Sequence, residues 1–303
     1  KVLTPSFTFI ATALSLSRCG IEPIFCDIDS TTLHITPETL SKAYTTGVSG
    51  VLGVNLFGSA ADVADIDRWA NTKGLKIYWD SSQALGCSVN EKKLSGNGDL
   101  EIFSLHATKI ISSAEGGFIT TNDAHIANRL RHIRSSYGAS GKEAVTKTSN
   151  GRMSELQAAI GLLSLEDYHK NVARNHELRD IYRSKLSGLN GITLEPFHGV
   201  SSSNASSLII RVDEKQFGTS SDILSKALAA ENVLARRYFE PGAHRAKQFA
   251  KSSQWDLPQT ERAQKSILAL PLGARVTEKI ACTISRLISE IATKAKVVTN
   301  ELR

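Results

Sequence analysis

Short apolar segments alternate with segments of helical spacing along the first part of the chain. The apolar segments, each predicted to form a strand, lie at residues 23–27, 51–57 and 75–79. Segments with helical spacing lie at residues 9–18 and 61–72, and each is followed by a glycine that can end a helix. Strands and helices in this order predict a doubly wound α/β domain with a mainly parallel sheet.

The pattern changes in the second half of the chain. Amphipathic helices are predicted at 154–170 and 171–189, the second as a bridge between domains, and the polar stretch 137–149 predicts a mobile loop. A compact α+β unit follows, with strands expected near 208–212, 233–238 and 267–270 and helices near 221–231 and 277–294. We therefore expect a large domain over residues 1–190 and a smaller C-terminal domain over residues 191–303.

Composition narrows the class of protein. With 303 residues, 41% hydrophobic and 22% charged, the chain has an ordinary globular composition, without the ~18-residue apolar run that a membrane span needs. The net charge of +6 is modest and the basic residues are scattered, which favours anionic small molecules over nucleic acid. The four cysteines (Cys19, Cys26, Cys87 and Cys282) form no C-x-x-C pair, so we expect buried thiols, a cytoplasmic location and no metal site.

Candidate chemistry gathers at the ends of two predicted strands. Lys109 follows a short apolar strand (100–105), and a deprotonated lysine amine forms Schiff bases with carbonyls such as that of pyridoxal phosphate. Asp80 ends the strand 75–79, and Ser104 lies five residues before the lysine. Each has a plainer interpretation taken alone: a loop cation, an Asx turn or helix cap, and a serine without a role. Ligands bind at the carboxyl ends of strands in such sheets.

Several motifs in order make the chain resemble a known family. They are Pro5-Ser-Phe-Thr-Phe9, Phe25-Cys-Asp-Ile-Asp29, Asp80-Ser-Ser-Gln83-Ala, Phe103-Ser-Leu-His-Ala-Thr-Lys109, Glu115-Gly-Gly and Asn150-Gly-Arg-Met-Ser-Glu-Leu-Gln. Through these motifs the chain resembles the DegT/StrS family of pyridoxal-phosphate-dependent sugar aminotransferases, which have the aspartate-aminotransferase fold (fold type I). The resemblance runs from residue 1 to about residue 300.

The resemblance implies a role for each matching residue. Lys109 would form the Schiff base and move the substrate proton, and Asp80 would pair with the pyridine nitrogen of the cofactor. Gln83 would bind the ring hydroxyl, Phe9 would stack on the ring, and Ser104 would bind the phosphate. Asn150 would reach the phosphate site of a neighbouring subunit, which implies a homodimer with shared active sites. A Gly-Thr segment of the family would precede residue 1, so we expect an N-terminal segment of the large domain to be missing.

The resemblance also implies the substrates. The donor would be glutamate and the acceptor a nucleotide-linked keto sugar, foremost a 4-keto-6-deoxyhexose, with a 3-keto sugar as the nearest alternative. The segment 236–244 resembles the family's substrate segment and offers Arg236, Tyr238 and His244, while His106 lies beside Lys109. A surface basic strand edge and a loop-capping histidine are the plainer interpretations. A non-catalytic relative, or an enzyme for amino acids alone, remains open, as does the pathway, whether lipopolysaccharide or antibiotic sugars.

Overall fold

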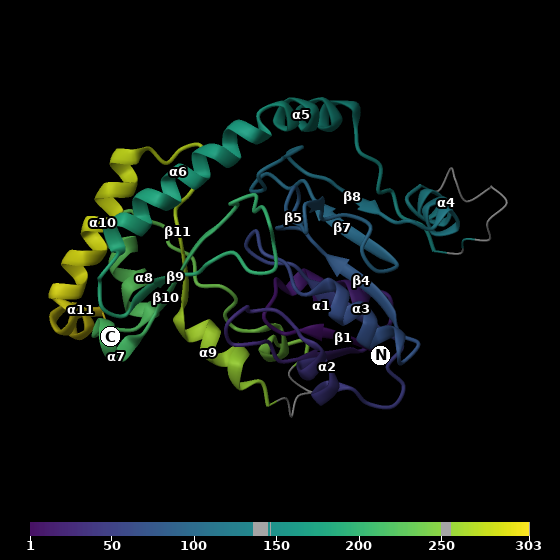
Figure 1. Cartoon of the computed structure of the whole chain (residues 1–303), viewed down its shortest axis with the longest axis horizontal. Coiled ribbons are helices and arrows are strands. Elements are labelled where there is room, and N and C mark those ends of the chain that lie inside the picture. Colours follow the sequence, from purple (N-terminus) through teal and green to yellow (C-terminus); the bar gives the residue numbers. More distant parts are fainter. Residues whose placement is uncertain (136–144, 146, 250–255, 303) are drawn as a thin grey trace.

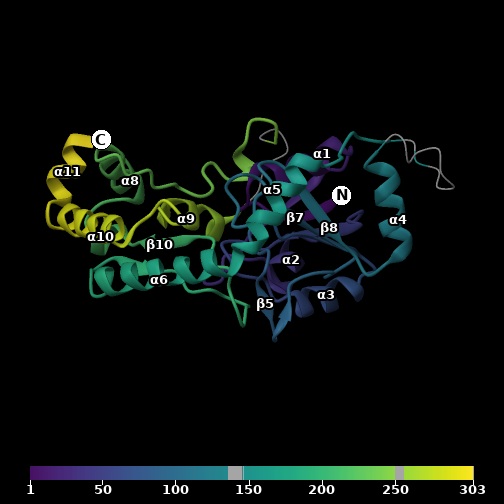
Figure 2. The ribbon, with the colours of Figure 1, turned by 90° about the horizontal axis from the view of Figure 1, so that it is seen from above.

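Two lobes with separate hydrophobic cores make up the protein, as the computed structural model in Figures 1 and 2 shows. The structure describes residues 1–135, 145, 147–249 and 256–302. Most of the loop predicted over 137–149 lies outside these described residues. Within them, no helix is long and apolar enough to cross a membrane.

The first lobe is built on a six-stranded sheet with the strand order β2-β1-β3-β4-β7-β8. All neighbouring pairs are parallel except β7 and β8, which confirms the predicted mainly parallel sheet. Its strands are β1 (Val2–Pro5), β2 (Pro23–Cys26), β3 (Gly50–Val54), β4 (Lys76–Asp80), β7 (Leu100–Ser104) and β8 (Gly117–Thr120). The short strands β5 (Ser88–Val89) and β6 (Lys92–Lys93) form a separate hairpin.

Helices α1 (Ile10–Arg18), α2 (Pro37–Ala43) and α3 (Val63–Asn71) pack against this sheet, and α1 and α3 lie close to where the apolar spacing predicts them. Helix α4 (Ala124–Ile133) follows β8 and has no buried residue (Figure 1). The core between sheet and helices contains Trp79, whose side chain is fully buried on β4. Gly53 faces that ring from β3, and a Cβ atom there would lie 2.4 Å from the ring. The indole therefore fills the space that a side chain at position 53 would need, and this packing fixes the strand that ends in Asp80.

The second lobe has an antiparallel three-stranded sheet with the order β11-β10-β9. Its strands are β9 (Ile192–Leu194), β10 (Leu208–Val212) and β11 (Ile267–Leu270); its helices are α7 (Glu214–Phe217), α8 (Ser221–Ala230), α9 (Pro258–Ser266), α10 (Glu278–Thr293) and α11 (Ala295–Leu302), with a 3₁₀ turn at Ala243–Arg245. The strand predicted near 233–238 is wrong. Only Arg236 pairs there, with Ala269, because the backbone turns at Val233–Ala235 and no longer follows β11.

Two helices, α5 (Glu155–Glu166) and α6 (Tyr168–Leu186), connect the lobes. The break between them falls at Asp167, so the junction predicted at residues 170 and 171 is displaced by a turn of helix. Leu178 and Tyr182 of α6 are buried in the core of the second lobe. We still propose a domain boundary near residue 190. Helix α6 precedes that boundary and packs into the hydrophobic core of the second lobe.

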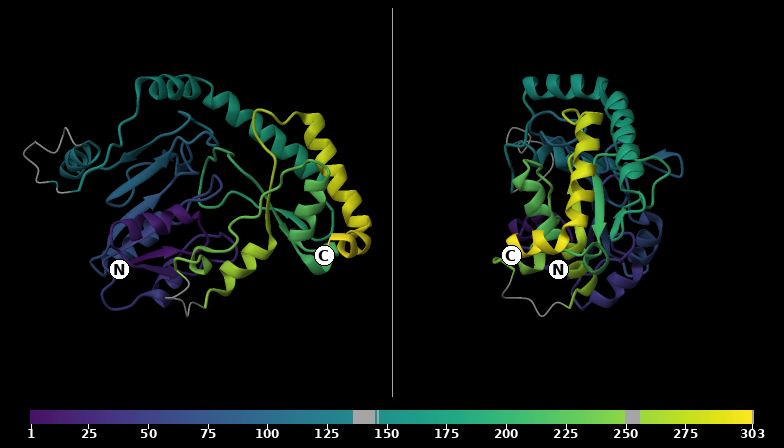
Figure 3. Two further views of the ribbon diagram at one scale, coloured as in Figure 1. Left: turned by 180° about the vertical axis from the view of Figure 1, so that it is seen from behind. Right: turned by 90° about the vertical axis from the view of Figure 1, so that its left-hand side faces the viewer.

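The two connecting helices differ in burial. Whereas α6 buries one side, α5 has no buried residue in the described structure and lies along the outer margin of the molecule (Figure 3). The amphipathic pattern predicted for this segment is therefore wrong for α5. Its leucines face solvent in the single chain.

Candidate active site

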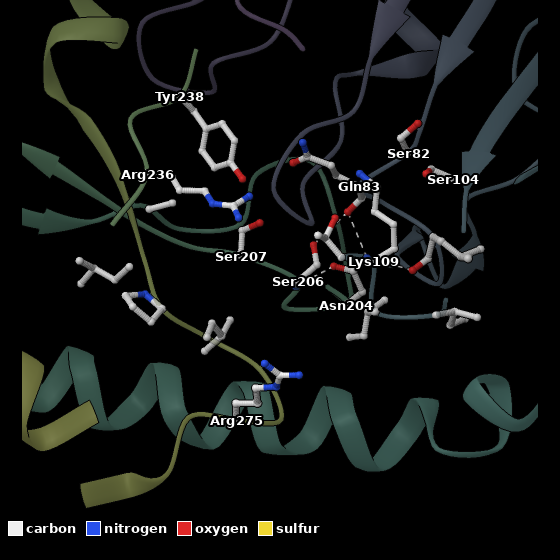
Figure 4. Close-up of a pocket in the computed structure, with 18 of the residues that line it drawn as sticks. Ser82, Gln83, Ser104, Lys109, Asn204, Ser206, Ser207, Arg236, Tyr238 and Arg275 are labelled. Atoms are coloured by element: carbon white, nitrogen blue, oxygen red, sulfur yellow. Dashed lines mark hydrogen bonds between the residues drawn. The ribbon is translucent and has the colours of Figure 1, made fainter. Parts of the chain in front are cut away.

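A cavity of about 510 Å³ lies between the two lobes, at the carboxyl ends of β4 and β7. Gln83, Ser104 and Lys109 line it from the first lobe, and Arg236, Tyr238 and Arg275 line it from the second (Figure 4). The position agrees with the rule that ligands bind outside the carboxyl ends of parallel strands. Residues predicted from separate motifs thus meet in one space.

Lys109 lies on the loop that leaves β7, and its backbone N–H donates to the carbonyl of His106 at 2.9 Å. Its side chain is half-buried and points into the cavity (Figure 4). Burial lowers the pKa of the Lys109 amine below its ordinary value, while the nearby carboxylate of Asp80 opposes that shift. The neutral, nucleophilic amine is therefore more populated than in an exposed lysine.

Asp80 is the last residue of β4, and two hydrogen bonds orient its carboxylate. Thr12 Oγ1 on α1 donates to Oδ2 at 2.8 Å, and the backbone N–H of Ser82 donates to Oδ1 at 3.1 Å. The second bond closes an Asx turn, the plainer interpretation of this residue. The two roles are compatible, because the same carboxylate closes the turn and acts electrostatically on the Lys109 amine.

Gln83 lines the cavity, and the oxygen of its side-chain amide is already hydrogen-bonded. Its Oε1 accepts a hydrogen bond from the backbone N–H of Phe57 at 2.9 Å, so the Nε2 group is the donor left for a ligand. Ser104 also lines the cavity, and its Oγ accepts from the backbone N–H of His106 at 3.3 Å. Both side chains lie on the Lys109 side of the cavity (Figure 4).

Asp80 does not itself line the cavity, and two further predicted cofactor contacts, Phe9 and Asn150, also lie outside the lining. Phe9 is the N-cap residue of α1 and is 62% exposed, on the helix that also supplies Thr12 to Asp80. Asn150 is exposed, and its Oδ1 accepts from Arg152 Nε at 3.2 Å. An exposed Asn150 agrees with a role in another subunit. Both roles stay predictions, since they concern a ring and a partner chain.

The four predicted substrate residues divide into two pairs. Arg236 and Tyr238 line the cavity, whereas His106 and His244 do not. The exposed ring of His106 lies within hydrogen-bond distance of Thr108 Oγ1 at 3.0 Å, as a loop-capping histidine does. His244 is 1% exposed and its Nδ1 contacts Ser6 Oγ. Both histidines therefore lie outside this cavity, in packing or capping positions, and their role at the substrate stays a prediction.

Other residues that line the cavity were not predicted from the sequence. Asn204, Ser206 and Ser207 come from the polar segment before β10, and Arg275 comes from the turn after β11. The Ser/Asn-rich run 201–207 directly ahead of an apolar strand is a signal that could have identified the first three. Nothing in the sequence near Arg275 distinguishes it from a surface arginine.

The residues on the Lys109 side fit pyridoxal phosphate. A lysine amine with a lowered pKa, an oriented carboxylate and the hydroxyls of Ser82, Ser104 and Thr108 supply what its aldehyde, ring nitrogen and phosphate would require. None of the described residues that line the cavity is acidic, so no negative charge on its wall opposes a phosphate.

Comparisons with known proteins agree with this assignment. The model of the DegT/DnrJ/EryC1/StrS aminotransferase family matches residues 1–289. The chain is 32% identical over 293 residues to a dTDP-4-amino-4,6-dideoxy-D-glucose transaminase of Shigella dysenteriae, covering 96% of this chain and 79% of the relative. It is 28% identical over 243 residues to a GDP-perosamine synthase of Vibrio cholerae, covering 80% and 66%.

A solved structure is similar over nearly the whole chain. It is that of DesI in the presence of its TDP-sugar product, with 33% sequence identity and a TM-score of 0.91. The match covers 99% of this chain and 76% of that one. The fold expected from the resemblance, a mainly parallel sheet with helices and a smaller second lobe, is confirmed.

The lowered pKa of Lys109 predicts how its reactivity depends on pH. At any pH below the ordinary lysine pKa near 10.5, a larger fraction of Lys109 than of an exposed lysine is neutral, because burial lowers its pKa. Treatment with pyridoxal phosphate and borohydride at pH 7 to 9 should label Lys109 first, as peptide mass spectrometry would detect. The exposed Lys226 is the internal control, and equal labelling of both lysines would contradict the proposed environment.

Proposed function

Because the chain belongs to the DegT/DnrJ/EryC1/StrS aminotransferase family and is a pyridoxal-phosphate-dependent aminotransferase, we propose that its acceptor is a nucleotide-linked 4-keto-6-deoxyhexose and its donor glutamate. The relatives named for transfer to a dTDP-sugar and for synthesis of a GDP-sugar support a nucleotide sugar. The first of these names places the amino group at C4 of the sugar. The nucleotide itself is left to the assay.

The observation that carries the proposal is Lys109 in the cavity between the lobes. Its amine is half-buried, is shifted toward the neutral form, and lies within the electrostatic influence of an oriented carboxylate. A cavity of about 510 Å³ matches the size of small-molecule sites, and it offers serine hydroxyls and arginines rather than acids. A regulatory protein without catalysis has no need of this arrangement.

We assign the chemical roles as follows. Bound pyridoxal phosphate supplies an electron sink for the electrons left when a proton leaves the substrate carbon. Lys109 Nζ takes that proton as a general base and returns one as a general acid, for which a pKa nearer neutrality is suited. Asp80, held by Thr12, supplies the negative charge that keeps the ring nitrogen protonated. Gln83 Nε2 and Ser104 Oγ orient the cofactor from the walls.

A two-stage assay tests the function. The holoenzyme should lose the visible absorbance of its bound pyridoxal phosphate when glutamate is added. It should regain that absorbance when a dTDP-, UDP- or GDP-linked 4-keto sugar follows. Lys109→Ala should lower the turnover rate by at least about 10⁴-fold, because no other described amine lines the cavity. Lys226→Ala, at an exposed position of α8, is the matched control. Recovery with plain keto acids alone, or full turnover in Lys109→Ala, would contradict the proposal.

The carboxylate of Asp80 should matter for the rate more than for sugar binding. We expect Asp80→Asn to lower kcat by about 100- to 1000-fold, because an amide carries no charge to hold a proton on the ring nitrogen. The KM for the sugar nucleotide should stay within about threefold. Thr12→Val removes one of the two hydrogen bonds to the Asp80 carboxylate and keeps its charge, so the loss of kcat should be at most about tenfold. An effect of Asp80→Asn on KM alone would be inconsistent with this role.

We further propose a homodimer formed through α5. Leu156, Leu162 and Leu163 on this helix are 72%, 64% and 63% exposed, far more apolar surface than an isolated helix face in water normally carries. The exposed Asn150 lies just before this helix, so a partner subunit bound to α5 comes close to the residue that the resemblance assigns to a shared site.

A cytoplasmic location, suggested by the free thiols, is also proposed and can be tested by cell fractionation.

Charge on α5 should separate the subunits. The double variant Leu156→Glu/Leu163→Glu should be monomeric at micromolar concentration and lose most of its activity, as measured by light scattering and turnover. Val297→Glu on α11 places a charge at another exposed apolar position and should remain dimeric. A monomeric wild-type protein, or a dimer that survives both glutamates, would show that α5 is not the interface.

A further inference from the structure

Two arginines enter the cavity without an acidic partner. Arg236 and Arg275 both line it, and neither guanidinium has a hydrogen bond or ion pair with any residue that the structure describes. The neighbouring Arg237 shows the alternative, because its guanidinium is bound by the carboxylates of Asp222 and Glu240. Arg236 and Arg275 therefore have their full donor capacity available for a ligand.

Arg275 is presented by a turn whose backbone is fixed. The turn runs from Gly273 to Val276, and it is closed by a hydrogen bond from the Val276 N–H to the Gly273 carbonyl at 2.9 Å. Gly273 has a φ of 109°, which favours glycine. Arg174 on α6 then donates to the Val276 carbonyl at 2.7 Å. The backbone on both sides of Arg275 is thus anchored, while its side chain extends toward the cavity (Figure 4).

Arg236 is anchored in a comparable way. It exchanges two backbone hydrogen bonds with Ala269 on β11, at 2.9 and 2.8 Å. Both arginines therefore belong to segments fixed to β11 or to the turn that follows it, and a ligand would need to order only the two side chains. A guanidinium offers parallel N–H donors that match the oxygen atoms of a phosphate or carboxylate.

We propose that Arg275, together with Arg236, binds the diphosphate of the acceptor, and that Arg275 is a specificity-determining residue for nucleotide-linked sugars. The inference rests on the proposed function. Figure 4 shows both guanidinium groups on the wall opposite Lys109, Gln83 and Ser104. The α-carboxylate of an amino-acid donor is bonded to the reacting carbon and must lie near Lys109. A diphosphate is instead separated from the reacting carbon by the sugar ring, which agrees with arginines on the opposite wall.

The same arrangement bears on the position of amination. In a hexose ring the diphosphate is attached at C1, and C4 lies directly across the ring from it. A sugar that extends from the arginines to Lys109 therefore presents C4 to the amine. A 3-keto sugar would have to rotate in the plane of its ring to bring C3 to the same place. Arg275 thus favours a 4-keto acceptor over a 3-keto acceptor.

Binding to the holoenzyme tests the site without any turnover. Titration calorimetry with thymidine diphosphate and with inorganic pyrophosphate should give a Kd about 10- to 100-fold weaker for Arg275→Ala than for the wild type. Arg275→Lys should recover part of the affinity, because it restores the charge but not the paired donors. Arg286→Ala on α10 removes the same charge from an exposed position outside the cavity and should bind like the wild type.

Half-reaction kinetics separate the acceptor from the donor. In Arg275→Ala the KM for the sugar nucleotide should rise about 10- to 100-fold with kcat within about threefold, while the rate with the amino-acid donor stays unchanged. A slower donor half-reaction with unchanged diphosphate affinity would assign Arg275 to the donor carboxylate and overturn the proposal. Unchanged affinity and unchanged KM would overturn it as well.

The failure of the proposed function and the failure of the role of Arg275 give different results. If no keto sugar nucleotide restores the absorbance of the wild type, the proposed acceptor is wrong, whatever the arginine variants do. If the wild type uses a sugar nucleotide and Arg275→Ala uses it equally well, only the role of Arg275 is wrong. Circular dichroism of each arginine variant should match that of the wild type, because the substituted side chains are exposed.

Discussion

The hydrogen bonds of Asn204 join the two lobes at the wall of the cavity that carries Gln83. Its side-chain amide donates to the carbonyls of Gln83 at 3.1 Å and Leu85 at 2.9 Å, and the residue is 1% exposed. Such bonds contribute about 1 kcal/mol each, but a buried carbonyl left without a donor costs about 1–3 kcal/mol. Asn204 therefore fixes the second lobe against the loop that carries Gln83, and Ser206 adds a third bond to the same carbonyl of Gln83.

The cavity has positively charged walls because its described lining contains no acidic residue. Arginines and a lysine gather there, yet no acidic residue lies among the described residues of the lining. The carboxylate of Asp80 is already bound to Thr12 and Ser82, and it only partly offsets the effect of burial on the pKa of Lys109. The protein thus shifts one amine toward its neutral form in surroundings that carry no negative charge on the cavity wall, a combination suited to anionic ligands.

The sequence predicted the parts of the site that follow from local order, and missed those that follow from tertiary packing. Asp80 ends β4, Gln83 lies three residues further on, and Lys109 lies on the loop that leaves β7, so the parallel sheet brings them to one edge. Arg275 reaches the cavity through a turn held by α6, a contact between distant segments that no spacing reveals. His244 resembled a substrate ligand by its place in a motif, yet its side chain is buried against Ser6. The break at Asp167 was likewise invisible in a continuous helical pattern.

The pairing of Gly53 with Trp79 has a consequence for variation in this protein. A glycine that accommodates an indole from the next strand can change only if the tryptophan becomes smaller at the same time. Position 53 and position 79 should therefore be inherited as a unit, and a change at either one alone would displace the strand end that carries Asp80. Such compensated pairs let a core drift in sequence while the reacting groups above it keep their places.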